Sequence, residues 1–174
     1  MRVQRPRLSR LFATPAALVG AGLALAACSP LSALDALVPE TGYRVEKDIA
    51  YGDDPRMRFD LCLPDGAFAS EVPPILFFYG GSWRRGDKAG YRFVGQAFAS
   101  RGIAVAVVDY RLFPEVRFPT FAEDAARAAE KLLAVAPAHG LPPRFVAMGA
   151  NAGGHTAAPL ALDPRYFEAG GVGP

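Results

Sequence analysis

Short runs of consecutive apolar residues dominate the pattern of the chain after residue 43. Three of these runs are too short for a helix and are typical of strands buried on both faces. They occupy residues 74–79, 103–108 and 145–148. Two earlier segments, Tyr43 to Tyr51 and Arg58 to Leu63, are also predicted to be strands. The Gly-Asp-Asp-Pro sequence between them favours a turn.

Helical spacing of apolar residues appears between and after these runs. The first helix is marked by Tyr91, Val94, Ala97 and Phe98. A second helix is predicted to begin at a capping box, in which Thr120 and Glu123 satisfy backbone donors of the first turn. One face of this helix is apolar: Phe121, Ala125, Ala128, Ala129 and Leu132. A third helix is predicted over residues 153–162, with Pro159 as an awkward interior residue.

Buried strands that alternate with helices predict the α/β class. The sheet is expected to be mostly parallel, with helices on both of its faces, so that the domain has three layers. The first two predicted strands are close in sequence and joined by a turn, so we expect them to form an antiparallel pair at one edge of the sheet.

The first 27 residues have a different character. Four arginines and no acid lie within the first ten residues, and Leu11 to Ala27 is an apolar stretch. This pattern is typical of a secretory signal, and the apolar stretch is short for a membrane-spanning helix. It ends in Leu25-Ala26-Ala27-Cys28, which resembles the lipobox of bacterial lipoproteins, in which the cysteine is acylated and becomes the new N-terminus.

We therefore expect a signal peptide over residues 1–27, a tether over residues 28–42 and a folded domain over residues 43–174. The protein is expected to be exported and held at a membrane by lipid on Cys28. An ordinary signal that is cleaved nearby and an uncleaved anchor are the alternatives.

Composition and charge narrow the classes of protein. The 174 residues are 51% hydrophobic and 21% charged, which fits one globular domain. The net charge is +2, but the predicted signal holds four arginines and no acid, so the mature part is slightly acidic and nothing indicates nucleic-acid binding. If Cys28 carries lipid, Cys62 is the remaining cysteine; it lies in an apolar stretch and is predicted to be buried and unreactive.

Two segments after buried strands contain candidate chemistry. Tyr79-Gly80-Gly81-Ser82-Trp83 follows the first run, and its glycines could point backbone N–H groups at a substrate oxygen that gains negative charge. A plain glycine turn is the alternative. Residues 109–115, Asp-Tyr-Arg-Leu-Phe-Pro-Glu, follow the second run, and we expect a polar loop held by an Asp–Arg pair.

The third segment, Gly149-Ala150-Asn151-Ala152-Gly153, lies between a predicted strand and a predicted helix. Strand, G-x-S-x-G and helix form the nucleophile elbow, in which a strained turn lifts a serine hydroxyl above the sheet. The glycines are needed because neighbouring chain passes close to the turn. Spacing and context therefore predict an elbow, with Asn151 at the position of the serine.

Together these segments resemble those of α/β-hydrolase esterases, and within these the BD-FAE (feruloyl-esterase-like) and hormone-sensitive-lipase-like carboxylesterases. There the segments follow one another as H-G-G-x-W, with tyrosine sometimes in place of histidine, D-Y-R-L-x-P-E and G-x-S-A-G. The resemblance runs from about Tyr43 to Tyr166. It implies hydrolysis of a small carboxylic ester without cofactor or metal. The site residues it implies are the oxyanion-hole positions Gly80, Gly81 and Ala152 and the substrate-binding residues Tyr79 and Trp83.

The sequence departs from this family pattern in two ways. Asn151 replaces the serine, and its amide nitrogen is conjugated with a carbonyl, so it is not a competent nucleophile. The family's acid and histidine follow the elbow, whereas this chain ends at Pro174. We therefore expect an incomplete α/β-hydrolase sandwich, truncated after the elbow helix. In such a domain strand 145–148 would be an exposed apolar edge.

Neither histidine of the chain is expected to act as the catalytic base. His139 is predicted to be an exposed loop residue, and His155 matches a non-catalytic histidine of the family's elbow helix. The leading hypothesis is a catalytically inactive, membrane-tethered member of an esterase family. Two alternatives stay open: an active carboxylesterase whose sequence is misread or incomplete, and a non-enzymatic binding lipoprotein.

Overall fold

The computed structural model describes residues 37–39, 41–66 and 71–169. The predicted signal peptide, Cys28 and most of the predicted tether lie outside the described residues. Within them, no helix is long and apolar enough to cross a membrane.

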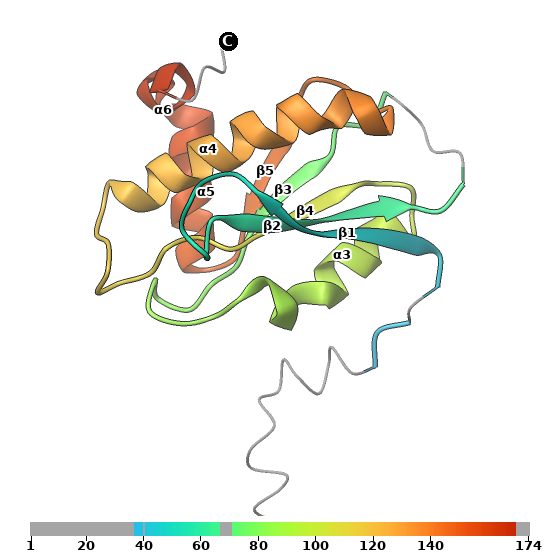
Figure 1. Cartoon of the computed structure of the whole chain (residues 1–174), viewed down its shortest axis with the longest axis horizontal. Coiled ribbons are helices and arrows are strands. Elements are labelled where there is room, and N and C mark those ends of the chain that lie inside the picture. The colour runs from blue at the N-terminus through green and yellow to red at the C-terminus, as the bar shows by residue number, and fades with distance from the viewer. Residues whose placement is uncertain (1–36, 40, 67–70, 170–174) are drawn as a thin grey trace, which may run out of the picture.

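The described residues form a five-stranded sheet in the order β1-β2-β4-β3-β5. The strands are β1 (Tyr43–Ala50), β2 (Arg58–Pro64), β3 (Ile75–Phe78), β4 (Val105–Val108) and β5 (Val146–Gly149). The pairs β1–β2 and β2–β4 are antiparallel, and β4, β3 and β5 run parallel. The predicted antiparallel pair at one edge is confirmed, and the sheet as a whole is mixed (Figure 1).

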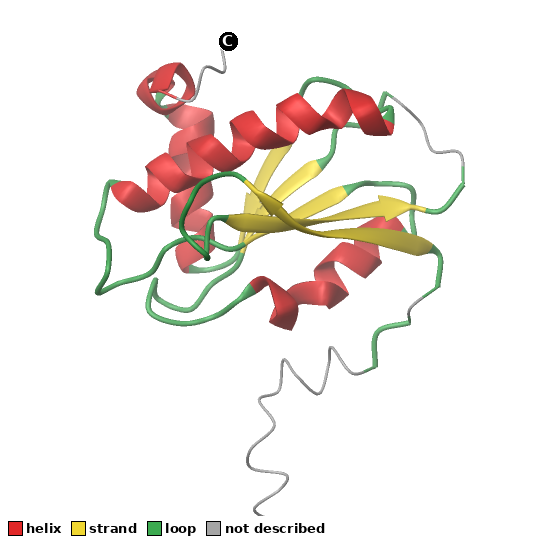
Figure 2. Ribbon diagram, in the orientation of Figure 1, coloured by secondary structure: helices red, strands yellow, loops and turns green. Residues whose placement is uncertain are grey.

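Helices cover both faces of this sheet, as Figure 2 shows. They are η1 (Lys88–Tyr91), α3 (Arg92–Ala99), α4 (Thr120–Val135), η2 (Ala136–His139), α5 (Ala152–Leu162) and α6 (Pro164–Ala169). The helix α3 packs on β2 and β4 from one side, whereas α4 and α5 pack against each other on the opposite side. The predicted three-layer α/β architecture is therefore confirmed.

The predicted capping box of α4 is wrong. The helix begins at Thr120, so that Pro119 is the capping residue, and no side chain bonds to the free N–H groups. The carbonyl of Pro119 accepts from the N–H groups of Ala122 (2.8 Å) and Glu123 (3.2 Å), so the donor that a capping threonine would satisfy, the N–H of Glu123, is already paired. The predicted apolar face is correct, because all of its members are buried.

The core lies on both sides of β3 and β4, whose eight residues are all buried. Cys62 on β2 is also buried, with 2% of its surface exposed, as predicted. Burial raises the pKa of its thiol to about 12, which keeps the thiol protonated at neutral pH.

The strand β5 is an edge strand within the described residues, since β3 is its partner in the sheet order. Its residues are less buried than those of β3, and Val146 is 49% exposed. The predicted apolar edge at this strand is therefore present in the structure.

Candidate active site

The turn between β5 and α5 has the geometry of a nucleophile elbow. Asn151 adopts φ 50° and ψ −119°, a strained backbone conformation for a residue with a side chain. Its backbone carbonyl accepts from the N–H groups of Gly154 (3.0 Å) and His155 (3.3 Å), which starts the helix directly after the turn. The predicted elbow is thus formed, and Asn151 stands exposed at its tip.

Close backbone contacts explain the glycines on either side of this turn. A β-carbon at Gly149 would lie 2.3 Å from the carbonyl carbon of Gly153. Contacts below 3.0 Å essentially never occur for a real β-carbon, so the strand and the helix can approach this closely only at glycine. The sequence spacing predicted this contact correctly.

The segment Tyr79 to Trp83 follows β3 and lies next to the elbow. A β-carbon at Gly80 would lie 3.0 Å from the β-carbon of Asn151, so the two turns touch. Gly81 has φ 127°, and a β-carbon there would lie 2.1 Å from the carbonyl oxygen of Arg85. These contacts place the predicted oxyanion loop beside the position of the missing hydroxyl.

Two of the three predicted oxyanion-hole positions, Gly81 and Ala152, have backbone N–H groups without a backbone partner among the described residues. Ala152 is the first residue of α5, where N–H groups lack partners within the helix. Such unpaired donors stabilise negative charge on a ligand oxygen, which is the task of an oxyanion hole.

Tyr79 lies beneath this loop rather than at its surface. Its side chain is fully buried and stacks on Tyr110, with 4.9 Å between ring centroids. The hydroxyl of Tyr110 donates to the backbone carbonyl of Tyr79 (2.7 Å), and Arg56 donates to the Tyr79 hydroxyl (2.6 Å). Burial raises the pKa of Tyr79 well above its usual range, so the phenol stays neutral. Tyr79 therefore packs in the core under the oxyanion loop and supports its backbone.

Arg56 is a residue of this site that the sequence did not single out. Its guanidinium donates to the carbonyl of Tyr110 (3.0 Å) and to that of Gly86 (2.7 Å), in addition to the Tyr79 hydroxyl. It therefore joins the loop after β3 to the loop after β4. No local signal marks this role, because each partner is at least 23 residues away along the chain.

Residues 109–115 form the predicted polar loop, but the predicted Asp–Arg pair is wrong. Arg111 pairs with Asp124 on α4, whose carboxylate is fully buried, through contacts of 2.5 to 3.2 Å. Asp109 instead accepts from the backbone N–H of Lys88 (2.7 Å) and lies 3.9 Å from Arg56. Burial raises the pKa of Asp109. Asp124 lies on the apolar face of α4, and an acid in such a position needs a buried partner. This feature of the sequence could have indicated that Asp124 pairs with Arg111.

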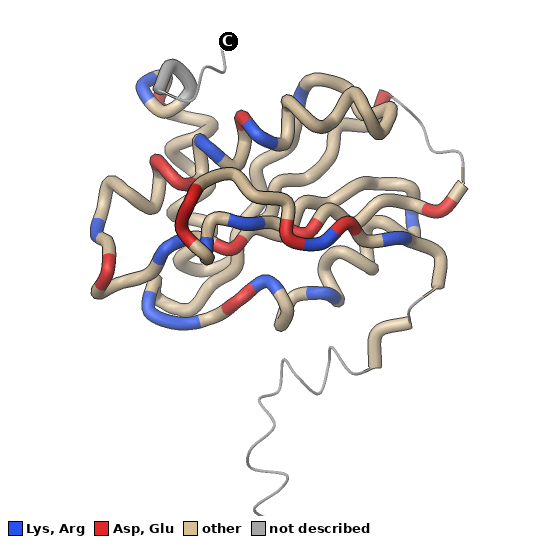
Figure 3. The backbone as a smooth tube through the Cα atoms, in the orientation of Figure 1, with Lys and Arg blue, Asp and Glu red and all other residues tan. Residues whose placement is uncertain are grey.

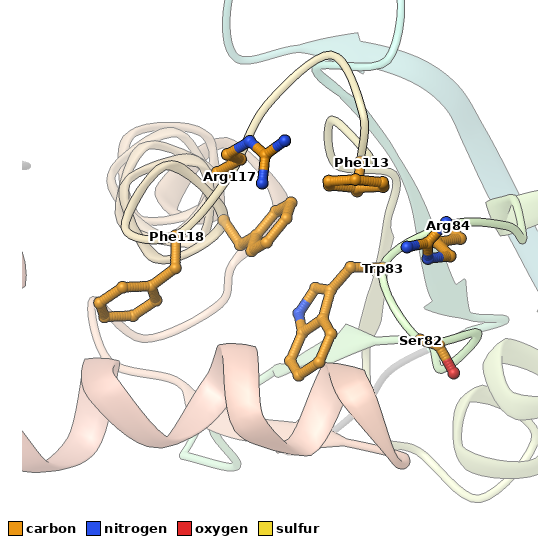
Figure 4. A pocket seen from close by; sticks show the side chains of 7 residues that line it. Ser82, Trp83, Arg84, Phe113, Arg117 and Phe118 are labelled. Atoms are coloured by element: carbon orange, nitrogen blue, oxygen red, sulfur yellow. The ribbon is translucent and has the colours of Figure 1, made fainter.

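Trp83 joins the oxyanion loop to the elbow helix. Its indole N–H donates to the hydroxyl of Thr156 (3.1 Å), and its ring packs on Phe121 and His155, with centroid distances of 5.8 and 5.3 Å. The ring lines a pocket of about 260 Å³, shown in Figure 4. The pocket is lined by Ser82, Trp83, Arg84, Phe113, Arg117, Phe118 and Phe121.

The two histidines lie apart from each other. His139 is not an exposed loop residue as predicted, since its side chain is only 15% exposed and lies 3.4 Å from Glu46 on β1. It belongs to η2, where the helical turn holds it against the sheet edge. His155 is exposed and packs edge-on against Trp83. Among the described residues, no group of three histidine, cysteine, aspartate or glutamate side chains could hold a metal ion.

A mixed sheet covered by helices on both faces, with an elbow at the end of a parallel strand, defines an α/β-hydrolase. The BD-FAE family model matches residues 59–168, and the chain belongs to this family.

Several relatives and solved structures of similar sequence and fold are esterases. Isoprenylcysteine alpha-carbonyl methylesterase of Arabidopsis thaliana is 36% identical over 126 residues, which are 72% of this chain and 29% of that protein. Esterase LipC of Mycobacterium tuberculosis is 31% identical over 130 residues, 71% of this chain and 32% of that protein. The chain thus spans about a third or less of the length of these curated relatives.

The solved structures show the same class. Esterase B from Lactobacillus rhamnosis superposes with a TM-score of 0.69 at 28% identity, over 91% of this chain and 52% of that one. A bacterial heroin esterase superposes with a TM-score of 0.64 at 29% identity, over 87% of this chain and 47% of that one. The chain is therefore a member of a carboxylesterase family.

Proposed function

We propose that this chain binds small carboxylic esters at an esterase-type site without hydrolysing them. The observation that carries the proposal is Asn151 at the tip of the elbow, with the strained backbone of a nucleophile and without a hydroxyl. Acyl transfer needs a nucleophile that can form a bond to the ester carbon, and the nitrogen of the asparagine amide is a poor one because its lone pair is conjugated with the carbonyl.

Two features beside the elbow, its unpaired backbone donors and a neighbouring pocket, support binding. The N–H groups of Gly81 and Ala152 are unpaired with backbone acceptors in the described residues and can receive an ester oxygen. The pocket of about 260 Å³ beside Trp83 can receive the attached chain. Donors that are held in place before the ligand arrives lose little entropy when it binds.

Asn151→Ser is not expected to give an esterase in this chain of 174 residues. A serine hydroxyl is a poor nucleophile until a base removes its proton. Both histidines of the chain have other contacts and are not expected to act as this base. His139 lies beside Glu46, and His155 packs against Trp83. The elbow would then carry a hydroxyl without its base.

The test is hydrolysis of 4-nitrophenyl butyrate by the full chain, with Asn151→Ala as the matched control and Asn151→Ser as the restored hydroxyl. The wild type and Asn151→Ala should give the same rate, at the level of the uncatalysed reaction. Turnover by the wild type that Asn151→Ala abolishes would overturn the proposal, because Asn151 would then take part in the chemistry. Turnover by Asn151→Ser alone would show that a base has been overlooked.

We also propose that the protein works at a membrane, as an exported lipoprotein anchored through Cys28. The support is in the sequence: a basic start, an apolar run and the Leu25-Ala26-Ala27-Cys28 sequence. Anchoring would hold the ligand site close to the membrane surface through the tether of residues 28–42.

A further inference from the structure

Two guanidinium groups lie over one aromatic ring in the pocket beside the elbow. The guanidinium carbon of Arg84 is 4.3 Å from the centroid of the Phe113 ring, and that of Arg117 is 4.8 Å from it. In Figure 4 the Phe113 ring is seen between the two arginine side chains. Stacking on an aromatic face fixes a guanidinium but leaves its N–H groups at the edge free to donate.

The pocket carries positive charge that carboxylates of the described residues do not balance. No acid is among the residues that line it, and neither arginine forms an ion pair within the part of the chain that the structure describes. The arginines come from the loops after β3 and β4, and Figure 3 shows that these loops carry both basic and acidic positions. The two guanidinium carbons lie 4.3 and 4.8 Å from the same ring centroid, so a bound anion would be attracted to both charges.

The pocket is also continuous with the elbow along the chain. Ser82, which lines it, directly follows Gly81 of the oxyanion loop. Trp83, another lining residue, packs against His155, which is four residues after Asn151 in the elbow helix. The pocket and the elbow are thus linked by adjacent residues and by the contact between Trp83 and His155.

We propose that the ligand of this site is a small carboxylic ester that carries a second acid group, ionised at neutral pH. Its anionic group would bind Arg84 and Arg117, its carbon chain would lie against Trp83 and Phe121, and its ester oxygen would face the donors of the elbow. The inference rests on the proposed function and specifies its ligand class. Carboxylates bind guanidinium groups through paired, charge-assisted hydrogen bonds, which gives arginine its preference for such ligands.

Trp83 is the only tryptophan of the chain, so its fluorescence reports occupancy of this pocket. The experiment titrates the full chain with monomethyl adipate, which has one ionised carboxylate, and with dimethyl adipate, which has the same carbon chain and no charge. The monoester should bind about tenfold more tightly or better, the factor expected for a hydrogen bond to a charged group. High salt should weaken its binding more than that of the diester.

Substitutions of the two arginines test whether they cause the preference for the charged ester. Arg84→Gln and Arg117→Gln should each reduce monoester affinity severalfold and leave diester affinity unchanged, while Arg84→Lys should retain part of the preference. Arg85→Gln is the matched control, since Arg85 is the exposed next residue and does not line the pocket. Circular dichroism spectra that match the wild type establish that each variant is folded.

The outcomes separate the two proposals. Equal affinity for the two esters, no response of Trp83, or an equal loss in Arg85→Gln would overturn the inference about charge. Release of methanol from either ester, followed by proton NMR in the same samples, would instead overturn the proposed absence of hydrolysis. If methanol is released and the monoester still binds more tightly, the inference about the ligand class holds and only the proposed absence of hydrolysis is wrong.

Discussion

A β-carbon at Gly153 would lie 2.0 Å from the backbone carbonyl oxygen of Phe78 and 2.5 Å from that of Tyr79. The first turn of α5 thus rests directly on the end of β3. This contact fixes the distance between the elbow and β3. The oxyanion loop is the segment that directly follows β3. Backbone atoms of a central strand cannot move aside as the end of a flexible side chain can.

Gly153→Ala is therefore expected to lower the free energy of unfolding by about 2–3 kcal/mol, the upper part of the usual range for overpacking. Gly154→Ala is the matched control, because Gly154 is the next residue of the same helix and a β-carbon there would lie 3.3 Å from its nearest neighbour. Its stability should stay within about 1 kcal/mol of the wild type, since alanine also favours the helix. Urea unfolding followed by circular dichroism checks both values, and equal losses would contradict the argument.

The buried carboxylate of Asp124 gives a second prediction. It holds Arg111 through contacts of 2.5 to 3.2 Å, and the loop of residues 109–115 is thereby fixed to α4. Asp124→Asn removes the charge and leaves the guanidinium without its partner, so the free energy of unfolding should fall by about 3 kcal/mol. Glu123→Gln, at the exposed neighbouring position, is the control and should change stability by less than about 0.5 kcal/mol. If the two variants lose equal stability in urea unfolding, the pair does not hold the loop.

Local signals predicted most of the fold. The apolar runs at β3, β4 and β5 and the glycines around Asn151 each depend on neighbours in sequence, so spacing alone located them. The capping box failed because a Thr-x-x-Glu pattern does not say whether threonine lies before the helix or in its first turn. Here the carbonyl of Pro119 already satisfies the first donors.

Contacts between distant segments were beyond what the pattern could predict. Arg111 was assigned to Asp109, two residues away in sequence. The position of Asp124 on the apolar face of α4 marked it as buried, but the pattern did not show that α4 brings it to Arg111. Arg56 was missed because its partners lie on two other loops. The stacking of Arg84 and Arg117 on Phe113 likewise depends on how the loops after β3 and β4 meet. These positions are set by tertiary packing.

Lipidation at Cys28 is the third prediction. In a bacterial host, the protein should be recovered with the membrane, and mass spectrometry should find an acylated Cys28 at the N-terminus. Cys28→Ser should move the protein to the soluble fraction, because acyl chains bury their hydrocarbon in the bilayer. Cys62→Ala is the matched control and should stay with the membrane. A soluble wild-type protein whose N-terminus begins elsewhere would contradict the assignment.

The fourth prediction concerns the buried thiol of Cys62. Burial raises its pKa from an ordinary value of 9.0 to about 12, so at pH 8 it is protonated and shielded in the native state. In the Cys28→Ser protein, in which Cys62 is the remaining thiol, a disulfide reagent should react only after denaturant is added. Rapid reaction of one thiol in native buffer would show that the β2 face is open to solvent.

The same shift predicts how stability changes with pH. The unfolded thiol loses its proton near pH 9, whereas the folded thiol keeps it until about pH 12. The contribution of Cys62 is therefore fully present below pH 9 and is lost as the pH rises from 9 toward 12, because the unfolded state then binds fewer protons. Tyrosines of the unfolded chain lose their protons in this range too, so Cys62→Ala provides the comparison. The free-energy difference between wild type and Cys62→Ala should be constant from pH 7 to 9 and should shrink above it. A difference that stays constant to pH 11 would contradict the raised pKa.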